Sequence, residues 1–277
     1  MTLRGVLKAV GAVRVAAVAA RLLERAGTGQ KLEVTAPVVR LPSLPAAWDG
    51  ARIAHWSDLH WLWKPPASFY WRAVDLCAAA RPDLVVYTGD FIYASAGVRE
   101  DLAELLRAVR APLGAYAVLG NNDHDYGRGE AVRRLVESAG VEVLANRHVL
   151  LRRGGQELCL AGVDDLWHER HDLRAALSGV NDSTVRVLLC HNPDFAEVLP
   201  VRPRVDLMLC GHSHGGQVRL PAPLAAPSPI DHRRYMSGLV RGPRCLVYTS
   251  RGLGMNGPRA VRFRCRPELP LLTLRRA

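Results

Sequence analysis

The sequence lacks a close cysteine pair, a low-complexity tract and a long run of apolar residues free of charge near its start. Its six cysteines include no C-x-x-C spacing, and most of them lie inside apolar segments. This distribution argues against a disulfide framework or a cysteine-based zinc site, and it is typical of small core residues in a reducing compartment. Lysine is also scarce, since only a few of the 37 Lys and Arg residues are lysines.

The N-terminal segment is apolar, but charges interrupt it. Basic residues divide residues 5–25, and the longest stretch between them is residues 15–20. So short a stretch predicts neither a transmembrane helix nor a signal peptide. On a helix the basic residues fall on one side, so residues 1–30 are predicted to be a basic amphipathic segment. Such a helix either lies on an anionic membrane or packs on the core with a solvated basic face. We expect a cytoplasmic protein, peripheral on the inner face of the membrane if the first alternative holds.

The remaining composition fits one large domain with a basic surface. The chain has 277 residues, of which 49% are hydrophobic, and residues 31–277 are predicted to form a single domain. The net charge of +11 suits an anionic partner, namely nucleic acid, an acidic lipid surface or a phosphorylated substrate. A high-GC genome that encodes Arg in place of Lys is an equally good explanation, so charge alone does not choose a partner.

The apolar pattern predicts more strands than helices in the second half of the chain. The predicted helices are residues 68–80, 99–110, 129–139 and 172–177. The predicted strands are residues 31–41, 52–57, 84–88, 115–119, 185–190 and 205–210, with others near 216–220, 244–249, 260–264 and 270–274. Residues 141–163 are predicted to be a meander with a turn at Gly154-Gly155. This order favours two sheets packed face to face, with helices outside.

Five short motifs of metal-ligand residue types each follow a short apolar run. They are Asp58-Leu59-His60, Gly89-Asp90, Gly120-Asn121-Asn122-Asp123, Cys190-His191-Asn192-Pro193, and Gly211-His212-Ser213-His214-Gly215-Gly216-Gln217. Apolar runs of this length predict buried strands. Because side chains at the carboxyl ends of such strands meet at one sheet edge, the motifs together predict a two-metal hydrolase.

The spacing within the motifs suits cation binding. On extended backbone the side chains of Asp58 and His60 point the same way, so both can bind one cation, and His212 and His214 repeat this spacing. Asp90 directly follows a glycine that permits a tight exit from the strand, and its carboxylate can bridge two metals. Each motif alone is weak evidence, since a lone histidine is more often a core residue and a lone aspartate a turn residue. Their joint occurrence at successive strand ends carries the prediction.

The predicted metal ligands are Asp58, His60, Asp90, Asn121, His191, His212 and His214. Only the two aspartates are anionic, so two divalent ions with a bridging hydroxide would leave a net positive charge of about one. Such a site suits a phosphate oxyanion and lowers the pKa of bridging water towards ~7. A mixed oxygen and nitrogen set fits Mn, Fe or Zn better than Ca or Mg, and we expect two ions of manganese, with iron and zinc as alternatives.

These motifs resemble those of the calcineurin-like metallophosphoesterase family. With Ser250–Gly254 and Pro267-Glu268, the final histidine motif is most similar to the bacterial branch of YkuE- and YaeI-type phosphodiesterases, which includes a class of UDP-2,3-diacylglucosamine hydrolases. The resemblance covers roughly residues 50–275 and implies an α/β fold, a four-layer α/β/β/α sandwich of two mixed sheets. It also implies two metal sites that share Asp90. One would use Asp58, His60, Asp90 and His214, and the other Asp90, Asn121, His191 and His212.

The sequence departs from the family pattern at two positions. Where the family reads Gly-Asn-His-Asp/Glu, with a histidine that contacts phosphate, this chain has Asn122, so the catalytic candidates are Asn122, Asp123 and His124. His124 either replaces the missing histidine or is an ordinary loop residue. Without a general acid, alkoxide leaving groups should react roughly 10²–10⁴-fold more slowly, which favours a pyrophosphate bond or an activated diester. Tyr93 stands where many members have an aspartate, which predicts weaker metal affinity.

Two further segments bear on the substrate. Trp61 and Trp63 follow the first motif and are predicted to be exposed, where they could meet an acyl chain, a base or a membrane interface. The Pro-rich loop 221–234 either walls the site or is a solvated surface loop. The expected partner is a phosphorylated small molecule, lipid-linked in one reading, with an anionic membrane surface and nucleic acid as alternatives.

The sequence thus predicts a two-metal hydrolase of a phosphodiester or pyrophosphate bond, acting on an amphiphilic substrate such as UDP-2,3-diacylglucosamine. A broad phosphodiesterase or nuclease is the second hypothesis. A non-catalytic metal-binding scaffold is the third, and it ranks last because no ligand is missing.

Overall fold

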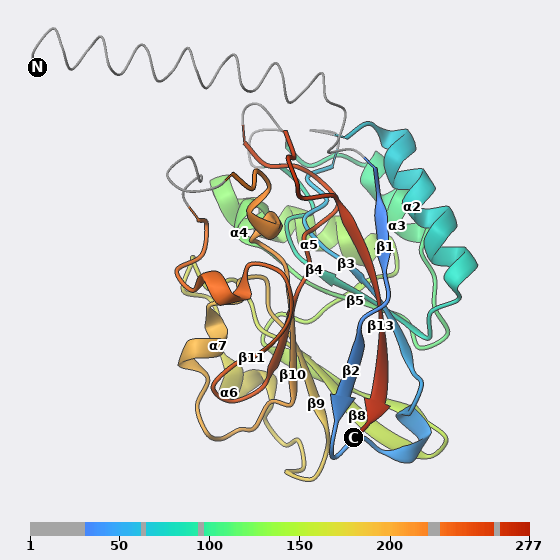
Figure 1. Cartoon of the computed structure of the whole chain (residues 1–277), viewed down its shortest axis with the longest axis vertical. Coiled ribbons are helices and arrows are strands. Elements are labelled where there is room, and N and C mark those ends of the chain that lie inside the picture. Colours follow the sequence, from blue (N-terminus) through green and yellow to red (C-terminus); the bar gives the residue numbers. More distant parts are fainter. Residues whose placement is uncertain (1–30, 62–64, 94–96, 221–227, 258–260) are drawn as a thin grey trace, which may run out of the picture.

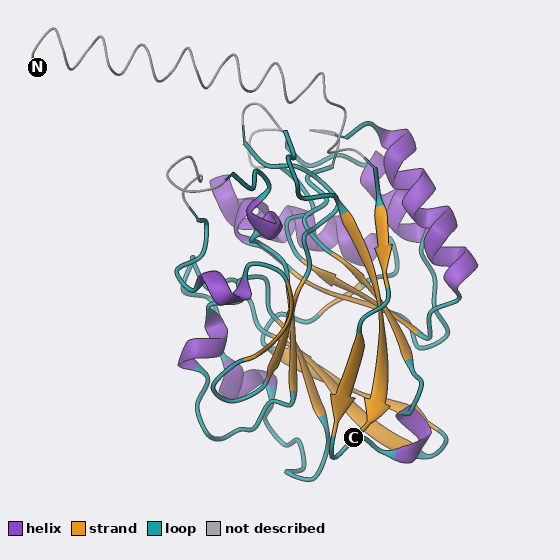
Figure 2. Ribbon diagram, viewed as in Figure 1, coloured by secondary structure: helices purple, strands orange, loops and turns teal. Residues whose placement is uncertain are grey.

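Two mixed sheets pack face to face, with helices on their outer faces (Figure 2). The computed structural model describes residues 31–61, 65–93, 97–220, 228–257 and 261–277. The predicted amphipathic segment 1–30, Trp63 and part of the Pro-rich loop 221–234 therefore lie outside the described residues. Among the described residues, no helix combines the length and hydropathy that a membrane crossing requires.

The first sheet brings three of the five motifs to one edge. Its strands are β1 (Glu33–Thr35), β2 (Val38–Leu41), β3 (Arg52–Trp56), β4 (Leu84–Thr88), β5 (Ala115–Val118), β6 (Glu142–Val143) and β13 (Glu268–Arg276). They are ordered β1-β13-β3-β4-β5-β6, and β2 also pairs with β13. Because β3, β4 and β5 are mutually parallel, their carboxyl ends lie at the same edge. Since β13 runs antiparallel to β3 and parallel to β1, the start of β1 lies at this edge too (Figure 1).

The second sheet brings the remaining two motifs. Its strands are β7 (Arg147–Arg153), β8 (Gln156–Gly162), β9 (Arg186–Leu189), β10 (Leu207–Cys210), β11 (Gly238–Arg241) and β12 (Leu246–Thr249). They are ordered β11-β12-β10-β9-β8-β7. The four inner strands are parallel, and the two edge strands pair antiparallel with their neighbours.

The helices and the apolar clusters define four layers. The larger helices are α2 (Ala67–Ala80), α3 (Asp101–Ala108) and α5 (Gly129–Ser138), and short ones are α4 (Asn121–His124), α6 (Leu173–Ala176) and α7 (Phe195–Val198). The 3₁₀ turns are η1 (Ala46–Trp48), η2 (Asp125–Gly127), η3 (His214–Gly216) and η4 (Arg233–Tyr235). One buried cluster joins α2, α3 and α5 to the first sheet, a second lies between the sheets, and a third joins α6 and α7 to the second sheet. This arrangement confirms the predicted α/β/β/α sandwich.

Some predicted elements are wrong in their pairing. Residues 141–144 do not join a meander, because β6 pairs in parallel with β5 in the first sheet, while β7 and β8 form a hairpin in the second. The chain reaches this parallel pairing with β5 through the helix α5, and the pairing buries Val143 in the layer that the helices cover. A hairpin with β7 would not place Val143 in that layer. Residues 31–41 form two strands rather than one, separated at Pro37, which has no amide hydrogen for a ladder.

The region after the last motif also differs from its prediction. Residues 216–220 contain no strand, and only an isolated bridge links Val218 to Phe263. The strand β11 was not predicted, since the sequence Gly238–Arg241 is short and carries no clear alternation. All six cysteines are buried and unpaired, as expected for core residues.

Candidate metal centre

The aspartates and histidines predicted to bind metal gather at the shared edge of the two sheets. Ligand atoms within 4.8 Å of one another form two groups, which are Asp58, His60, Asp90 and His214, and Asp90, His191 and His212. All of these residues are buried. The first sheet supplies the aspartates and His60, and the second sheet supplies the other three histidines. Asp90 belongs to both groups, so it occupies the bridging position.

The distances between side-chain atoms match those between ligands of a common ion. In the first group His60 Nε2 lies 3.0 Å from His214 Nε2 and 3.5 Å from Asp90 Oδ2. In the second group His191 Nε2 lies 3.2 Å from His212 Nδ1 and 3.4 Å from Asp90 Oδ1. Two ligands bound tetrahedrally at about 2.1 Å from one ion are about 3.4 Å apart. Each oxygen of Asp90 therefore faces a different group.

Three of the histidines are oriented by backbone carbonyls. His60 Nδ1 lies 3.3 Å from the Ile92 oxygen, and His191 Nδ1 lies 2.6 Å from the Thr88 oxygen. His212 Nε2 lies 3.2 Å from the Pro229 oxygen. Because a carbonyl only accepts, it assigns the proton to the ring nitrogen facing it and leaves the other nitrogen as an electron-pair donor. That second nitrogen is the one that faces the cluster in every case.

The backbone is strained where the ligands lie. Asp58, His60, Asp90, His212 and His214 all have φ between 42° and 66°, in the left-handed region that non-glycine residues seldom adopt. The expectation that Asp58 and His60 share a direction through extended backbone is therefore wrong. The strand ends at Trp56, and the pair converges through two left-handed residues. Strain of this kind persists where surrounding contacts impose it, and it concentrates at functional sites.

Two glycines allow the motif loops to meet. Gly89 has φ of 85°, and a Cβ there would overlap the backbone of Gly120. A Cβ on Gly211 would overlap Ser57 Oγ and Asp58 Oδ2. The Asp58 carboxylate is in turn fixed by the Ser57 hydroxyl, at 2.6 Å, and by the backbone N–H of His212, at 3.0 Å. A side chain at either glycine would separate strands that carry ligands.

The charges of the cluster favour a bound cation. Burial lowers the pKa of His191, but the Asp90 and Asp58 carboxylates outweigh burial and raise that pKa to about 10. Burial raises the pKa of Asp90, yet His191 and the other histidines hold it well below its usual range. Burial and the neighbouring His191 lower the pKa of His212 to about 4. The carboxylates thus attract positive charge, while His212 keeps a free electron pair.

An unsatisfied oxygen tests whether the predicted metals fit. Asn121 Oδ1 is buried and has no hydrogen-bond partner among the described residues. Its neighbours on both sides approach Asp90, because Asn122 N–H donates to Asp90 Oδ1 at 2.9 Å and a Cβ on Gly120 would overlap that same oxygen. An unpaired buried carbonyl beside a bridging carboxylate suits a divalent cation. The residues therefore fit a two-metal site.

The three catalytic candidates make different contacts. Asn122 Nδ2 donates to Asp90 Oδ2 at 2.7 Å, so Asn122 holds the bridging carboxylate. Asp123 accepts from the N–H groups of Gly120 and Ile92 and fixes the loop, and burial together with Asp90 raises its pKa to about 7. His124 Nε2 lies 2.7 Å from Asp164 Oδ1, and neither residue belongs to the two ligand groups. A role for His124 in proton transfer stays a prediction.

The aromatic segment after the first motif is partly misjudged. Trp61 is only 3% exposed, and its Nε1–H donates to Asp101, so the prediction of an exposed Trp61 is wrong. The ring packs against Tyr70 because the helix α2 returns over the loop. Trp71, on α2, is 40% exposed. Tyr93 lies with its ring 5.8 Å from that of His60, where an aspartate would have added a carboxylate.

Two residues near the cluster escaped the sequence reasoning. Trp167 lies in the loop after β8, and its ring centroid is 4.4 Å from that of His212. The motifs were found because they follow strands, and the same criterion would have pointed to this loop. Arg262 is buried and donates to the carbonyl oxygens of Gly254, Arg251 and His214. Nothing in its irregular sequence context signals this position.

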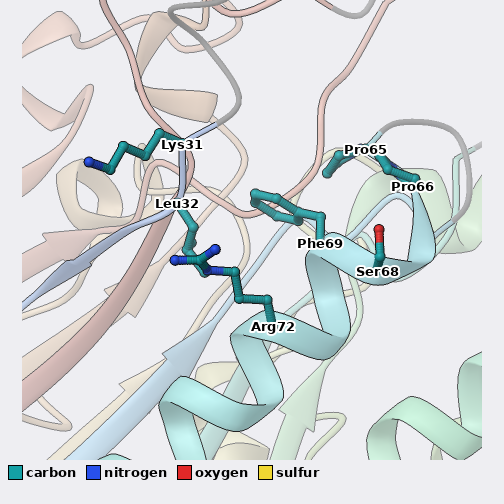
Figure 3. A pocket seen from close by; sticks show the side chains of 7 residues that line it. All are labelled: Lys31, Leu32, Pro65, Pro66, Ser68, Phe69 and Arg72. Atoms are coloured by element: carbon teal, nitrogen blue, oxygen red, sulfur yellow. The ribbon is translucent and has the colours of Figure 1, made fainter.

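Two clefts open on the described part of the chain. The larger has a volume of about 590 Å³ and is lined by Lys31, Leu32, Pro65, Pro66, Ser68, Phe69 and Arg72. In Figure 3, Phe69 and Arg72 reach from α2 towards Leu32, while Lys31 extends away from the helix. The smaller, of about 380 Å³, includes His124, Asp164, His168 and Arg170 in its lining.

The parallel strands of this α/β/β/α sandwich deliver two overlapping groups of aspartate and histidine side chains to one edge. This arrangement defines the class of binuclear, metal-dependent hydrolases. Within that class, residues 51–216 match the family model "Calcineurin-like phosphoesterase", and the chain belongs to this family. Membership implies a dinuclear divalent-metal site and phosphoesterase chemistry.

Several curated relatives match most of the chain. The metallophosphoesterase YkuE of Bacillus subtilis is 33% identical over 88% of this chain and 86% of its own length. The phosphodiesterase YaeI of Escherichia coli is 31% identical over 80% of this chain and 82% of its own. The UDP-2,3-diacylglucosamine pyrophosphatase LpxG of Chlamydia muridarum is 28% identical over 84% of this chain and 86% of its own length. These similarities agree with the branch predicted from the motifs.

Proposed function

We propose that this chain hydrolyses a phosphodiester or pyrophosphate bond with two divalent ions bound by the seven predicted ligands. The observation that carries the proposal is Asp90, whose two carboxylate oxygens face different histidine groups. Two bound ions would supply an activated water and neutralise the phosphate oxygens. Manganese is the ion we expect, because the ligand set mixes oxygen and imidazole nitrogen.

The chain's own residues then orient the site. Asn122 holds both oxygens of Asp90 through its backbone and side-chain N–H groups, which keeps the carboxylate in its bridging orientation. The carbonyl partners of the histidines fix each ring so that its other nitrogen faces the cluster. Because Asn122 cannot donate a proton as an acid, a leaving group that needs little protonation is favoured. A phosphate or nucleotide leaving group meets that condition.

An amphiphilic substrate such as UDP-2,3-diacylglucosamine is the specific substrate we propose. The name of the relative LpxG supports a substrate of this type. The larger cleft also supports an amphiphilic substrate, since apolar side chains such as Phe69 lie there beside the cations Lys31 and Arg72. This cleft lies within reach of the metal centre. Pro65, which lines the cleft, can be at most about 18 Å from His60 along an extended chain. Such a substrate would place the protein at the inner face of a membrane.

A broad phosphodiesterase is the second candidate function. It is supported by the name of the relative YaeI, which specifies only a phosphodiesterase. It requires no lipid and predicts turnover of simple soluble diesters. The scaffold hypothesis is weakened by the two groups of candidate ligands and by family membership.

The decisive experiment compares two substrates with the full chain loaded with Mn²⁺. Hydrolysis of bis-p-nitrophenyl phosphate is measured beside that of UDP-2,3-diacylglucosamine in detergent, with Asp90→Ala as the blank. We expect Asp90→Ala to lower the rate at least about 100-fold, since residues that only orient metal ligands already contribute about 10- to 100-fold. A circular dichroism spectrum of the variant controls for folding.

The outcomes separate the hypotheses. Release of UMP far above the rate of nitrophenol release supports the lipid-precursor substrate. Turnover of the nitrophenyl diester alone supports the broad phosphodiesterase. If neither rate exceeds that of a folded Asp90→Ala variant, the catalytic proposal fails and the scaffold hypothesis gains.

A further inference from the structure

Two loops beside the metal centre each present an exposed aromatic ring. The first comprises residues 121–128 after β5 and carries Tyr126, which is 77% exposed. The second comprises residues 163–172 after β8 and carries Trp167, which is 55% exposed. Single exposed rings are common on protein surfaces, but these two lie on the loops at the metal-bearing edge of the sheets.

The two loops are fastened to one another. His124 Nε2 lies 2.7 Å from Asp164 Oδ1, and His168 Nε2 lies 3.5 Å from Asp125 Oδ1. Residues of both loops line the cleft of about 380 Å³. Burial lowers the pKa of His124, but the hydrogen bond and charge of Asp164 outweigh burial and raise that pKa, so the pairing favours the protonated imidazole. The cleft is thus bounded by a fixed pair of loops.

The turn that carries Trp167 is itself rigid. The buried carboxylate of Asp165 accepts from both the backbone N–H and the Nδ1 of His168, at 2.9 and 2.7 Å. The backbone N–H of Arg170 donates to the Asp165 carbonyl, and its Nε donates to Asp164 at 3.0 Å. Trp167 is therefore held outward by a closed turn on either side of it, which lowers the entropy lost when a ligand binds.

The position of Trp167 relates it to the metal centre. Its ring meets the His212 imidazole edge-on, with centroids 4.4 Å apart and planes at 85°. Tyr126 is less available, since the Arg128 guanidinium lies 4.9 Å above its ring. Trp167 is accordingly the open aromatic surface next to a ligand of the proposed phosphate site.

We propose that Trp167 forms a stacking subsite for a nucleobase of the substrate, an inference that rests on the proposed phosphoesterase function. A single open ring on a rigid turn matches a planar group, because stacking needs one flat face and a fixed orientation. An acyl chain instead needs a continuous apolar groove, and the cleft beside this turn is lined largely by charged and polar residues. The substrate class is therefore a nucleotide ester, with its phosphate at the metals and its base against Trp167.

The test uses three esters with the same nitrophenolate leaving group. They are thymidine 5′-(p-nitrophenyl phosphate), methyl p-nitrophenyl phosphate and octyl p-nitrophenyl phosphate, each with the Mn-loaded full chain. Stacking on an aromatic side chain is worth about 5- to 150-fold in affinity. We expect Trp167→Ala to raise the KM of the thymidine ester by that factor and to change the methyl ester's KM less than twofold. Trp167→Phe should restore most of the difference.

The matched control is Trp71→Ala, which removes another exposed tryptophan, on α2. It should leave the KM of every ester unchanged. If Trp167→Ala weakens the methyl and thymidine esters equally, the stacking subsite is wrong. If it weakens the octyl ester as much as the thymidine ester, the assignment to a nucleobase is wrong.

A binding measurement keeps the inference testable without turnover. Calorimetric titration of the Mn-loaded protein compares thymidine 5′-monophosphate with methyl phosphate. We expect the wild type to bind the nucleotide more tightly and Trp167→Ala to lose that preference. Equal binding of the two phosphates by the wild type would overturn the subsite. Failure of the proposed function is distinguishable, because it would appear as absence of hydrolysis above the Asp90→Ala blank.

Discussion

At the scale of single residues, the contacts of Asn122 bear on which leaving groups the proposed site would favour. Its backbone and side chain donate to the two oxygens of Asp90, so it supports the bridging carboxylate rather than a departing oxygen. An amide has no proton to give to an alkoxide. The substrate range of this chain should therefore depend on leaving-group basicity more steeply than that of relatives with a histidine at this position.

We predict that Asn122→His increases the rate for an alkoxide leaving group relative to a nitrophenolate one. The ratio of rates for a dinucleoside phosphate and methyl p-nitrophenyl phosphate should rise at least about tenfold, the lower part of the range for general acid catalysis. The ratio is insensitive to a partial loss of bound metal, which slows both substrates. Asn122→Ala is the control and should leave the ratio unchanged, and an unchanged ratio in Asn122→His would refute the assignment.

At the scale of elements, the last strand anchors the loop that supports Asp58. Glu268, the first residue of β13, accepts hydrogen bonds from Thr35 at 2.6 Å and from Tyr248 at 2.8 Å. It also accepts from the Nε and the backbone N–H of Arg251, each at 3.0 Å. The loop after β12 then donates from Gly254 N–H to the carbonyl of Asp58. The Ser250–Gly254 and Pro267-Glu268 motifs thus support the metal centre without contributing a ligand.

We predict that Glu268→Gln destabilises the fold. Breaking a buried ion pair by removing one partner costs about 3–5 kcal/mol, and retained hydrogen bonds bring our expectation to about 3 kcal/mol. For a domain of this size that lowers Tm by roughly 6–12 °C. Thermal unfolding followed by circular dichroism measures it, with Glu157→Gln, on an exposed pair with Arg152, as the control expected to shift Tm little.

The lowered pKa of Glu268 predicts how the loss of Tm in Glu268→Gln depends on pH. Burial raises the pKa of Glu268, but Thr35 and Arg251 outweigh burial and hold that pKa below its ordinary value. A carboxyl group whose pKa is lowered by folding contributes its stability fully above its unfolded pKa and loses it as the pH falls towards the folded pKa. The difference in Tm between wild type and Glu268→Gln should be constant at pH 6–8 and shrink below about pH 4.5. A difference that grows on acidification would contradict the role given to Glu268.

The elements that position the site were more predictable than the elements at its borders. Strands such as Leu84–Thr88 and Leu207–Cys210 are continuous apolar runs, which bury both faces in parallel sheets and are visible in sequence. The pairing of Glu142–Val143 was not visible in the sequence, because two residues carry no periodicity and the crossover helix determines which strand they pair with. The conformation of the ligands was also hidden. A left-handed φ at Asp58 or His214 is imposed by tertiary contacts that the local sequence does not contain.

At the scale of the whole molecule, the proposed metal ions would join the two sheets. The ligand group of the first ion takes Asp58 and His60 from the first sheet and His214 from the second. The second group takes Asp90 from the first sheet and His191 and His212 from the second. Without cations, the carboxylates and imidazoles face one another at 3.0 to 3.5 Å in a buried site. Metal binding should therefore stabilise the sandwich as well as activate it.

We predict that removal of metal lowers the stability of the folded chain. A ligand present at about 1,000 times its Kd stabilises the native state by about 4 kcal/mol, which corresponds to roughly 8–16 °C in Tm for a domain of this size. The measurement is thermal unfolding of the wild type after chelation and again after Mn²⁺ is restored. Asp90→Ala, which removes the shared ligand, should melt at the same temperature in both conditions. If chelation leaves the Tm of the wild type unchanged, the buried cluster is stable without ions, and the two sheets are held by their apolar interface alone.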